Sequence, residues 1–142
     1  ELCLNVDDEA DRQLLLSHGW ALSSPLKMSL DPFGYPEFFR RSRAEWTVAK
    51  DQNVRLRSGW FSERDACYLA SGKPVISQST GFENVLPTGE GLFAFRTYEE
   101  AVAAVETIEA DYPKACRAAR RVAEEHLEAA SVCGRLLSEI GL

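Results

Sequence analysis

The sequence predicts an α/β domain in which helices cover both faces of an open parallel sheet. Residues 44–49, 74–77 and 91–95 are short apolar segments with the branched and aromatic residues of buried strands. Helical patterns lie between them, and strands that alternate with helices pair in parallel through βαβ crossovers. With 142 residues, 45% of them hydrophobic, the chain is long enough to bury a core. We therefore expect a single domain over residues 1–142, with a sheet of about four or five strands.

The first part of the chain predicts two short strands and two helices. Residues 2–6 form the first strand, and Asp7–Asp8 can cap the helix that follows. That helix ends at Gly19, because glycine readily adopts the left-handed conformation that terminates helices. A second short strand is expected at 20–22. After a loop rich in serine and proline, Pro36 suits the first turn of another helix.

The middle of the chain supplies the remaining strands and one long loop. Residues 60–71 have helical spacing of apolar side chains, and Gly72 ends that helix just before the strand at 74–77. The loop over 77–90 is rich in glycine, serine, threonine and proline. It leads into the strand at 91–95.

The last third of the chain is predicted to be helical throughout. Thr97 with Glu100 forms a capping-box pattern, and Pro113 restarts a helix after a short break. We therefore divide the domain into a part of mixed strands and helices, residues 1–96, and a helical C-terminal tail, residues 97–142.

The net charge of −6 is unevenly distributed along the chain. Cations outnumber acids between residues 40 and 64, whereas the segment from 97 onward is acidic. A local basic stretch in an acidic chain favours one small anionic ligand over a polyanion, so we expect no nucleic-acid partner. The alternative is that these charges only solvate the surface.

The cysteines and the apolar runs exclude several classes of protein. The four cysteines have no paired spacing, so we expect no metal site and reduced thiols in a cytoplasmic protein. They are Cys3, Cys67, Cys116 and Cys133. No apolar run approaches the roughly 18 residues of a membrane span, and no signal-peptide pattern opens the chain. Because Glu1 already lies in a strand-like segment, we expect the sequence to be a piece of a longer protein.

The segment from Arg57 to Ile76 carries the predicted chemistry. A loop that leads into a helix leaves several backbone N–H groups unpaired, and with the helix dipole they make an anion site. The loop after Ile76 leaves its strand at the same edge of the sheet, where open α/β sheets bind ligands. The sequence contains no Ser-His-Asp order, no P-loop and no metal-ligand spacing.

The order of motifs in this region resembles the C-terminal domain of GT-B glycosyltransferases (family 1/4-like). A helix ends in Ala-Ser-Gly-Lys-Pro-Val-Ile at 70–76, a loop follows with Gly81, and Thr-Gly-Glu-Gly-Leu-Phe at 88–93 enters the next strand. The similarity covers residues 44 to 110. It implies a Rossmann-like lobe that binds a nucleoside-diphosphate sugar without a metal or other cofactor.

The sequence departs from the retaining enzymes of this family at two positions. Those enzymes carry two glutamates eight positions apart, one for the donor sugar and one for the nucleotide ribose. The corresponding residues here are Gly59 and Cys67. Glu63 and Asp65 lie within about one helical turn of Cys67, so they are the acidic side chains available to replace the missing glutamates.

The resemblance and the anion-site argument together select a set of candidate donor-binding residues. They are Lys50, Gly59, Trp60, Ser62, Glu63, Arg64, Thr80 and Gly81. Gly59, Ser62 and the amides around them are expected to hold the diphosphate, while Lys50 and Arg64 neutralise its charge. The plainer alternatives are a serine-capped helix and solvated cations.

The remaining candidates are assigned to the sugar, the ribose and the base. Glu63 is expected to bind a hydroxyl, Thr80 and Gly81 to let a loop approach the donor, and Trp60 to stack on the base. The alternatives are a first-turn acid favoured by the helix dipole and a turn chosen for its backbone conformation. No catalytic residue is assigned.

The leading function is the donor-binding half of a glycosyltransferase, which moves a sugar from a nucleoside-diphosphate sugar to an acceptor. An N-terminal acceptor domain of the same chain is the missing partner, so we expect this domain to be inactive in isolation. The alternative is a non-catalytic nucleotide- or anion-binding module, or an interaction module, on the same scaffold. An exposed sheet edge near Leu2–Val6 would also allow the fragment to form a homodimer.

Overall fold

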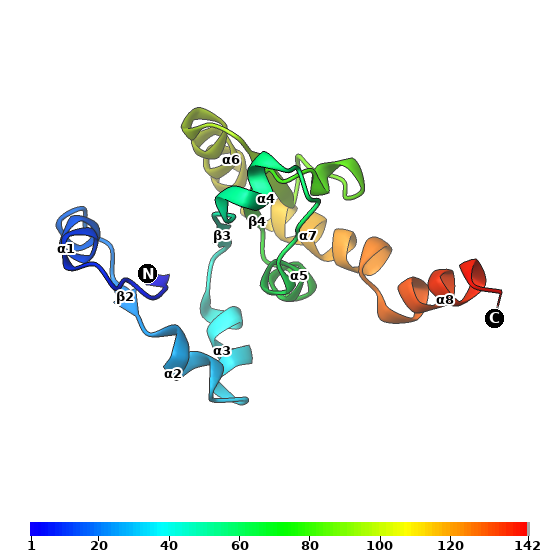
Figure 1. The fold of residues 1–142 in the computed structure, drawn as a ribbon, viewed down its shortest axis with the longest axis horizontal. Coiled ribbons are helices and arrows are strands. Elements are labelled where there is room, and N and C mark those ends of the chain that lie inside the picture. Colours follow the sequence, from blue (N-terminus) through cyan, green and yellow to red (C-terminus); the bar gives the residue numbers. More distant parts are fainter. Residues whose placement is uncertain (142) are drawn as a thin grey trace. The chain divides into compact units, whose positions relative to one another are not determined.

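A computed structural model describes residues 1–141 as a mixed α/β fold with two small parallel sheets and several helices (Figure 1). Contacts within the chain group it into two compact units, Glu1–Arg41 and Ser42–Leu142. The sequence predicts one domain with one sheet of four or five strands. Residues 1–141 form five strands, but each unit builds its own sheet, with two strands in the first and three in the second.

The first unit is a short βαβ element followed by two helices. Its elements are β1 (Leu2–Cys3), α1 (Glu9–Ser17), β2 (Leu22–Ser23), α2 (Pro25–Ser29) and α3 (Gly34–Arg41). Leu2 pairs with Leu22 in the parallel ladder. Asp8 caps α1 by accepting hydrogen bonds from two backbone N–H groups, and Gly19 follows the helix with φ of 82°, so both predicted helix boundaries are confirmed.

The second unit contains the three-stranded sheet and most of the buried core. Its elements are β3 (Glu45–Thr47), α4 (Asp51–Arg55), α5 (Glu63–Ala70), β4 (Val75–Gln78), the 3₁₀ helix η1 (Phe82–Asn84), β5 (Leu92–Phe95), α6 (Tyr98–Ala110), α7 (Tyr112–His126) and α8 (Ala129–Glu139). The strands follow chain order, β3-β4-β5, and are all parallel. The three predicted strands are confirmed, and α4 is a helix that the sequence did not predict.

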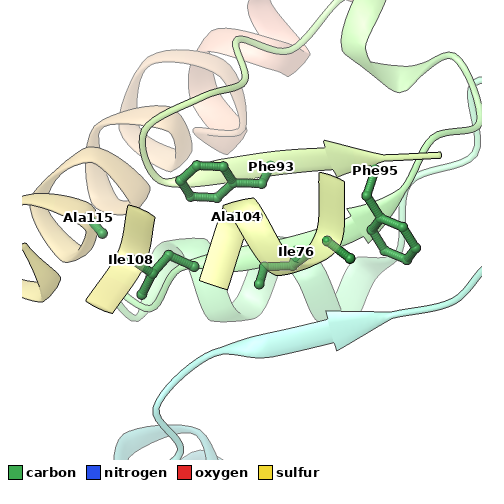
Figure 2. Packing of buried hydrophobic residues seen from close by; sticks show 7 residues of the cluster. Ile76, Phe93, Phe95, Ala104, Ile108 and Ala115 are labelled. Atoms are coloured by element: carbon green, nitrogen blue, oxygen red, sulfur yellow. The ribbon is translucent and has the colours of Figure 1, made fainter. Parts of the chain in front are cut away.

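Helices cover both faces of the three-stranded sheet. On one face, Ile76, Phe93 and Phe95 pack against the buried side of α6, which includes Ala104 and Ile108 (Figure 2). On the other face, α5 contacts β3 and β4, and Val75, Leu92 and Leu69 of α5 are fully buried. The alternation of strand side chains between the two faces produces this division.

Small residues on α7 allow that helix to approach its neighbours closely. Its buried residues are Ala115, Ala118, Ala119, Val122 and Ala123. A Cβ atom placed on Gly91, just before β5, would overlap the backbone nitrogen of Ala119 and lie 2.5 Å from the carbonyl carbon of Ala118. Glycine is therefore required at position 91 for van der Waals reasons, and not for its backbone dihedral angles.

The C-terminal helices agree with the predicted helical tail. Thr97 is the N-cap of α6 and accepts a hydrogen bond from the N–H of Glu100, as the capping pattern predicts. Asp111 caps α7, with Pro113 in its first turn. None of the helices formed by residues 1–141 is long and apolar enough to cross a membrane.

Candidate functional site

Two connecting loops are hydrogen-bonded to each other at the carboxyl edge of the three-stranded sheet. One loop joins α4 to α5, and the other follows β4. The N–H of Gly59 donates to the carbonyl oxygen of Thr80 at 2.9 Å, and the Thr80 hydroxyl donates to the carbonyl oxygen of Trp60 at 2.5 Å. The structure therefore brings together four of the predicted site residues, Gly59, Trp60, Thr80 and Gly81.

Backbone conformation explains both glycines of this junction. Gly59 has φ of 74° and Gly81 has φ of 101°, which are left-handed values that other residues rarely adopt. A Cβ atom on Gly81 would lie 3.2 Å from the carbonyl oxygen of Arg57, so the two loops also touch there. A Cβ atom on Gly59 would have no heavy atom within 4 Å. Gly59 therefore faces open space at the surface of the junction.

The Thr80 hydroxyl holds the junction together, so Thr80→Val is expected to lower the free energy of unfolding by about 1 kcal/mol. Thr80 is fully buried, and valine keeps its shape but cannot donate to Trp60. Urea unfolding of the whole chain measures the loss. Thr107→Val is the matched control, because the Thr107 hydroxyl also bonds a backbone carbonyl, that of Ala103, but on an exposed helix face. Equal effects of the two substitutions would contradict the prediction.

The remaining predicted residues lie at two helix starts. Ser62 is buried and caps α5 by accepting a hydrogen bond from the N–H of Arg64 at 3.2 Å. Glu63 is exposed in the first turn of α5. The Arg64 guanidinium donates to Glu45 of β3, so it already neutralises a carboxylate. Lys50 precedes α4 with an exposed side chain that forms no ion pair within residues 1–141.

Asp65 is fully buried between α5 and the sheet and cannot reach a ligand at the surface. Its Oδ1 accepts a hydrogen bond from the Thr47 hydroxyl at 2.6 Å. Burial raises the pKa of Asp65 from 3.8 to about 6, opposed by the hydrogen bond from Thr47 and by the nearby Ser77 hydroxyl. Of the two predicted acidic candidates, Glu63 and Asp65, only Glu63 is at the surface.

A carboxylate and two arginines that the site prediction did not include converge beside the junction. Glu83 accepts from the Ser79 hydroxyl at 2.6 Å and from the N–H of Gly81 at 3.1 Å. Arg96 lies 2.7 Å from Oε1 of Glu83, and Arg57 lies 3.6 Å from the same atom. Burial acts to raise the pKa of Glu83, but these hydrogen bonds and the charge of Arg96 outweigh it, so the pKa is lowered.

A small cavity of about 160 Å³ opens beside this group. It is lined by Val54, Arg57, Gln78, Ser79 and Arg96. Arg57 has φ of 47°, an unusual value for a residue other than glycine, and such backbone strain is concentrated at functional sites. A larger cavity of about 320 Å³ lies between α7 and the loop before β5, where Glu90 pairs with Arg121 at 3.2 Å.

The part of the chain that the structure describes contains no group of histidine, cysteine and acidic side chains able to hold a metal ion. No protein-family model, no curated protein and no solved structure matches the chain. The site must therefore be interpreted from its own geometry.

Proposed function

We propose that this chain binds a nucleoside-diphosphate sugar at the carboxyl edge of the three-stranded sheet, as the donor-binding C-terminal lobe of a GT-B glycosyltransferase. The observation that carries the proposal is the junction of the loops at Gly59–Trp60 and Thr80–Gly81. The junction lies beside the start of α5, at the edge where parallel α/β sheets bind their ligands.

The geometry suggests a role for each part of this edge. The backbone N–H groups around Gly59 and at the start of α5 are suited to phosphate oxygens, because the helix dipole favours negative charge there. The Trp60 side chain is partly exposed, so its ring is accessible to a base. Glu63 is exposed one turn from Cys67 and can accept hydrogen bonds from sugar or ribose hydroxyls.

Sugar transfer breaks the bond between the anomeric carbon and the diphosphate, and an acceptor hydroxyl takes the place of the leaving group. The diphosphate leaves with an added negative charge. Hydrogen-bond donors and cations already in place stabilise that charge as it develops. The acceptor domain proposed to complete the enzyme is not among the 142 residues of this sequence, so these residues alone are expected to bind the donor without turning it over.

Calorimetry with uridine and guanosine diphosphates and with their nucleotide sugars tests the proposal, and Glu63→Gln is the informative substitution. We expect one of the two nucleotide sugars to bind saturably and Glu63→Gln to weaken it about tenfold, because a carboxylate accepts hydroxyl hydrogen bonds more strongly than an amide. Glu63 also faces the helix dipole, but that contribution to stability is only about 0.3–1 kcal/mol. Thermal unfolding of the same variant separates the two roles.

Glu99→Gln is the matched control, because Glu99 is an exposed acid in the first turn of α6. It should leave nucleotide-sugar affinity unchanged. Absence of binding for both nucleotides and their sugars would refute the proposal.

A second candidate is a non-catalytic anion-binding module on the same scaffold. It is favoured by Gly59 and Cys67, which stand where the family has glutamates, and by the two arginines beside Glu83. Such a module binds phosphate groups but does not distinguish nucleotide sugars from simpler phosphates. A sugar-transfer assay on a longer protein that contains an acceptor domain separates the two candidates.

A further inference from the structure

Three connections at the carboxyl edge of the sheet meet at Glu83. Arg57 comes from the loop between α4 and α5, Glu83 from the turn after β4, and Arg96 from the residue directly after β5. Both guanidinium groups approach the same oxygen, Oε1 of Glu83, at 3.6 and 2.7 Å. Residues far apart in sequence thus form one group of two cations and one anion.

Neighbouring groups hold the backbone of both arginines in place before any ligand arrives. The N–H of Arg96 donates to Oε2 of Glu100 at 2.6 Å, so the start of α6 holds Arg96 in place. The carbonyl oxygen of Arg57 would lie 3.2 Å from a Cβ atom on Gly81, so the backbone of Arg57 runs close to the second loop, and its φ of 47° is a left-handed value. A binding group that is held in advance loses less conformational entropy when the ligand binds.

The group keeps a positive charge and unused hydrogen-bond donors. Glu83 neutralises only one of the two guanidinium charges. Each guanidinium has five N–H donors, and among residues 1–141 Glu83 is the one carboxylate that pairs with either guanidinium group, since Glu100 bonds only the backbone N–H of Arg96. The Arg57 and Arg96 side chains are 55% and 53% exposed, so an anion can reach them from solvent.

The neutral lining of the cavity adds donors and no further negative charge. Oε1 of Gln78 accepts a hydrogen bond from the N–H of Ala49 at 3.1 Å, which leaves the side-chain N–H₂ of Gln78 as a donor. Val54 and Ser79 complete the lining. The cavity of about 160 Å³ lies below the roughly 300 Å³ at which pockets for drug-sized ligands begin. It therefore has room for a phosphate or diphosphate group and not for a whole nucleotide sugar.

We infer that Arg57 and Arg96 form a phosphate site that takes the diphosphate of the ligand, while Glu83 positions both guanidinium groups. Planar guanidinium groups suit phosphate because they can donate two parallel hydrogen bonds. Only the nucleoside and sugar parts of the ligand rest on the proposed function, because the arginine site itself recognises phosphate. We therefore assign the neutralising role to Arg57 and Arg96 in place of Lys50 and Arg64.

Calorimetry with inorganic pyrophosphate on the whole chain tests the inference. Arg57→Gly is the preferred substitution, because glycine removes the guanidinium and accepts the φ of 47° without strain. Arg96→Ala removes the other cation. We expect each substitution to weaken pyrophosphate binding about tenfold or more, since each removes a charge-assisted hydrogen bond. Arg96→Lys keeps the charge and should recover only part of the affinity, because lysine cannot donate in parallel.

Arg121→Ala is the matched control for charge. The Arg121 side chain is 52% exposed and pairs with one carboxylate, Glu90, at the larger cavity. Arg121→Ala removes the same charge as Arg96→Ala, but at a different place on the surface. Because salt screens long-range electrostatics, this control should change pyrophosphate affinity less than about twofold. Equal losses in Arg57→Gly, Arg96→Ala and Arg121→Ala, or no loss in the first two, would overturn the inference.

A second titration series with uridine and guanosine diphosphates separates this inference from the proposed function. Arginine-dependent pyrophosphate binding without nucleotide binding supports the phosphate site and refutes the donor-binding function. Nucleotide binding that Arg57→Gly and Arg96→Ala leave intact refutes the phosphate site and supports the donor-binding function. Absence of binding by pyrophosphate and by both nucleotides refutes both.

Discussion

Gly91→Ala is expected to lower the free energy of unfolding by about 3 kcal/mol, the upper part of the range for overpacked cores. The added methyl group would collide with the backbone of Ala118 and Ala119 in α7. A flexible side chain can rotate away from such a contact, but a helix backbone cannot. Either α7 moves away from β5 as a unit, or the strand moves, and both changes open the packing that α7 makes with its neighbours.

Urea unfolding monitored by circular dichroism measures this effect, with Gly134→Ala as the control. Gly134 lies within α8, and a Cβ atom there would have no heavy atom within 4 Å. The same substitution should therefore stabilise the chain by roughly 0.5–1 kcal/mol, because alanine favours helix more than glycine does. Opposite signs for the two variants are the expected result. A stable Gly91→Ala variant would show that α7 does not pack as closely as described.

The free energy of unfolding is expected to fall as the pH rises from 4 to 7, and Asp65→Asn should remove that fall. Asp65 has a pKa of about 6 in the folded chain and an ordinary value of 3.8, so folding takes up a proton between these values. The contribution of protonated Asp65 to the free energy of unfolding is fully present below pH 4 and is lost as the pH rises through 6. At about 1.4 kcal/mol per pKa unit, the loss is about 3 kcal/mol.

The groups around Asp65 act on its pKa and determine what the substitution Asp65→Asn preserves. Glu45 raises its pKa and Arg64 lowers it, while the hydroxyl groups of Thr47 and Ser77 face it from the sheet. Asparagine keeps an oxygen for the hydroxyl of Thr47 and carries no charge at any pH. The stability of Asp65→Asn relative to the natural chain should therefore increase by about 3 kcal/mol between pH 4 and pH 7.

Denaturant unfolding at several pH values between 4 and 7 tests this difference. Carboxylates with lowered pKa values, such as Glu83 and Glu128, change the free energy of unfolding in the opposite direction at lower pH. Their contributions are the same in both proteins, so they cancel in the difference between Asp65→Asn and the natural chain. Asp51→Asn is the control, because the side chain of Asp51 is 78% exposed. Parallel pH profiles for the natural chain and Asp65→Asn would contradict the assignment.

Local patterns in the sequence predicted the second unit well. The strands of the three-stranded sheet are apolar and bounded by turn residues, and the helix starts at Ser62 and Thr97 are marked by side chains that bond the next N–H groups. These features depend on neighbours in the chain, so sequence alone contains them. The separation into two sheets depends on which strands pair across long connections, which local patterns do not specify.

Only those parts of the candidate site that depend on local backbone conformation were predicted from the sequence. Gly59 and Gly81 were predicted as site residues, and both have positive φ values that favour glycine. The hydrogen bonds that join their two loops were not predicted. Two residues further along a helix the side chain is rotated by about 200° about the helix axis, so Glu63 and Asp65 lie on nearly opposite faces of α5. The sequence does not state which of the two faces the sheet. The group at Glu83 joins three connections, and only the folded chain brings their charges together.

The chain-order arrangement of the three-stranded sheet also has a consequence for colloidal behaviour. Within residues 1–141, β3 and β5 each pair with β4 alone, so this sheet has two open edges. An open edge is a template for adding a strand from another molecule, which begins aggregation. Here the edges are only three and four residues long, and copies with a net charge of −6 repel one another. High salt screens that repulsion and leaves the shortness of the strands as the remaining barrier to edge-to-edge stacking.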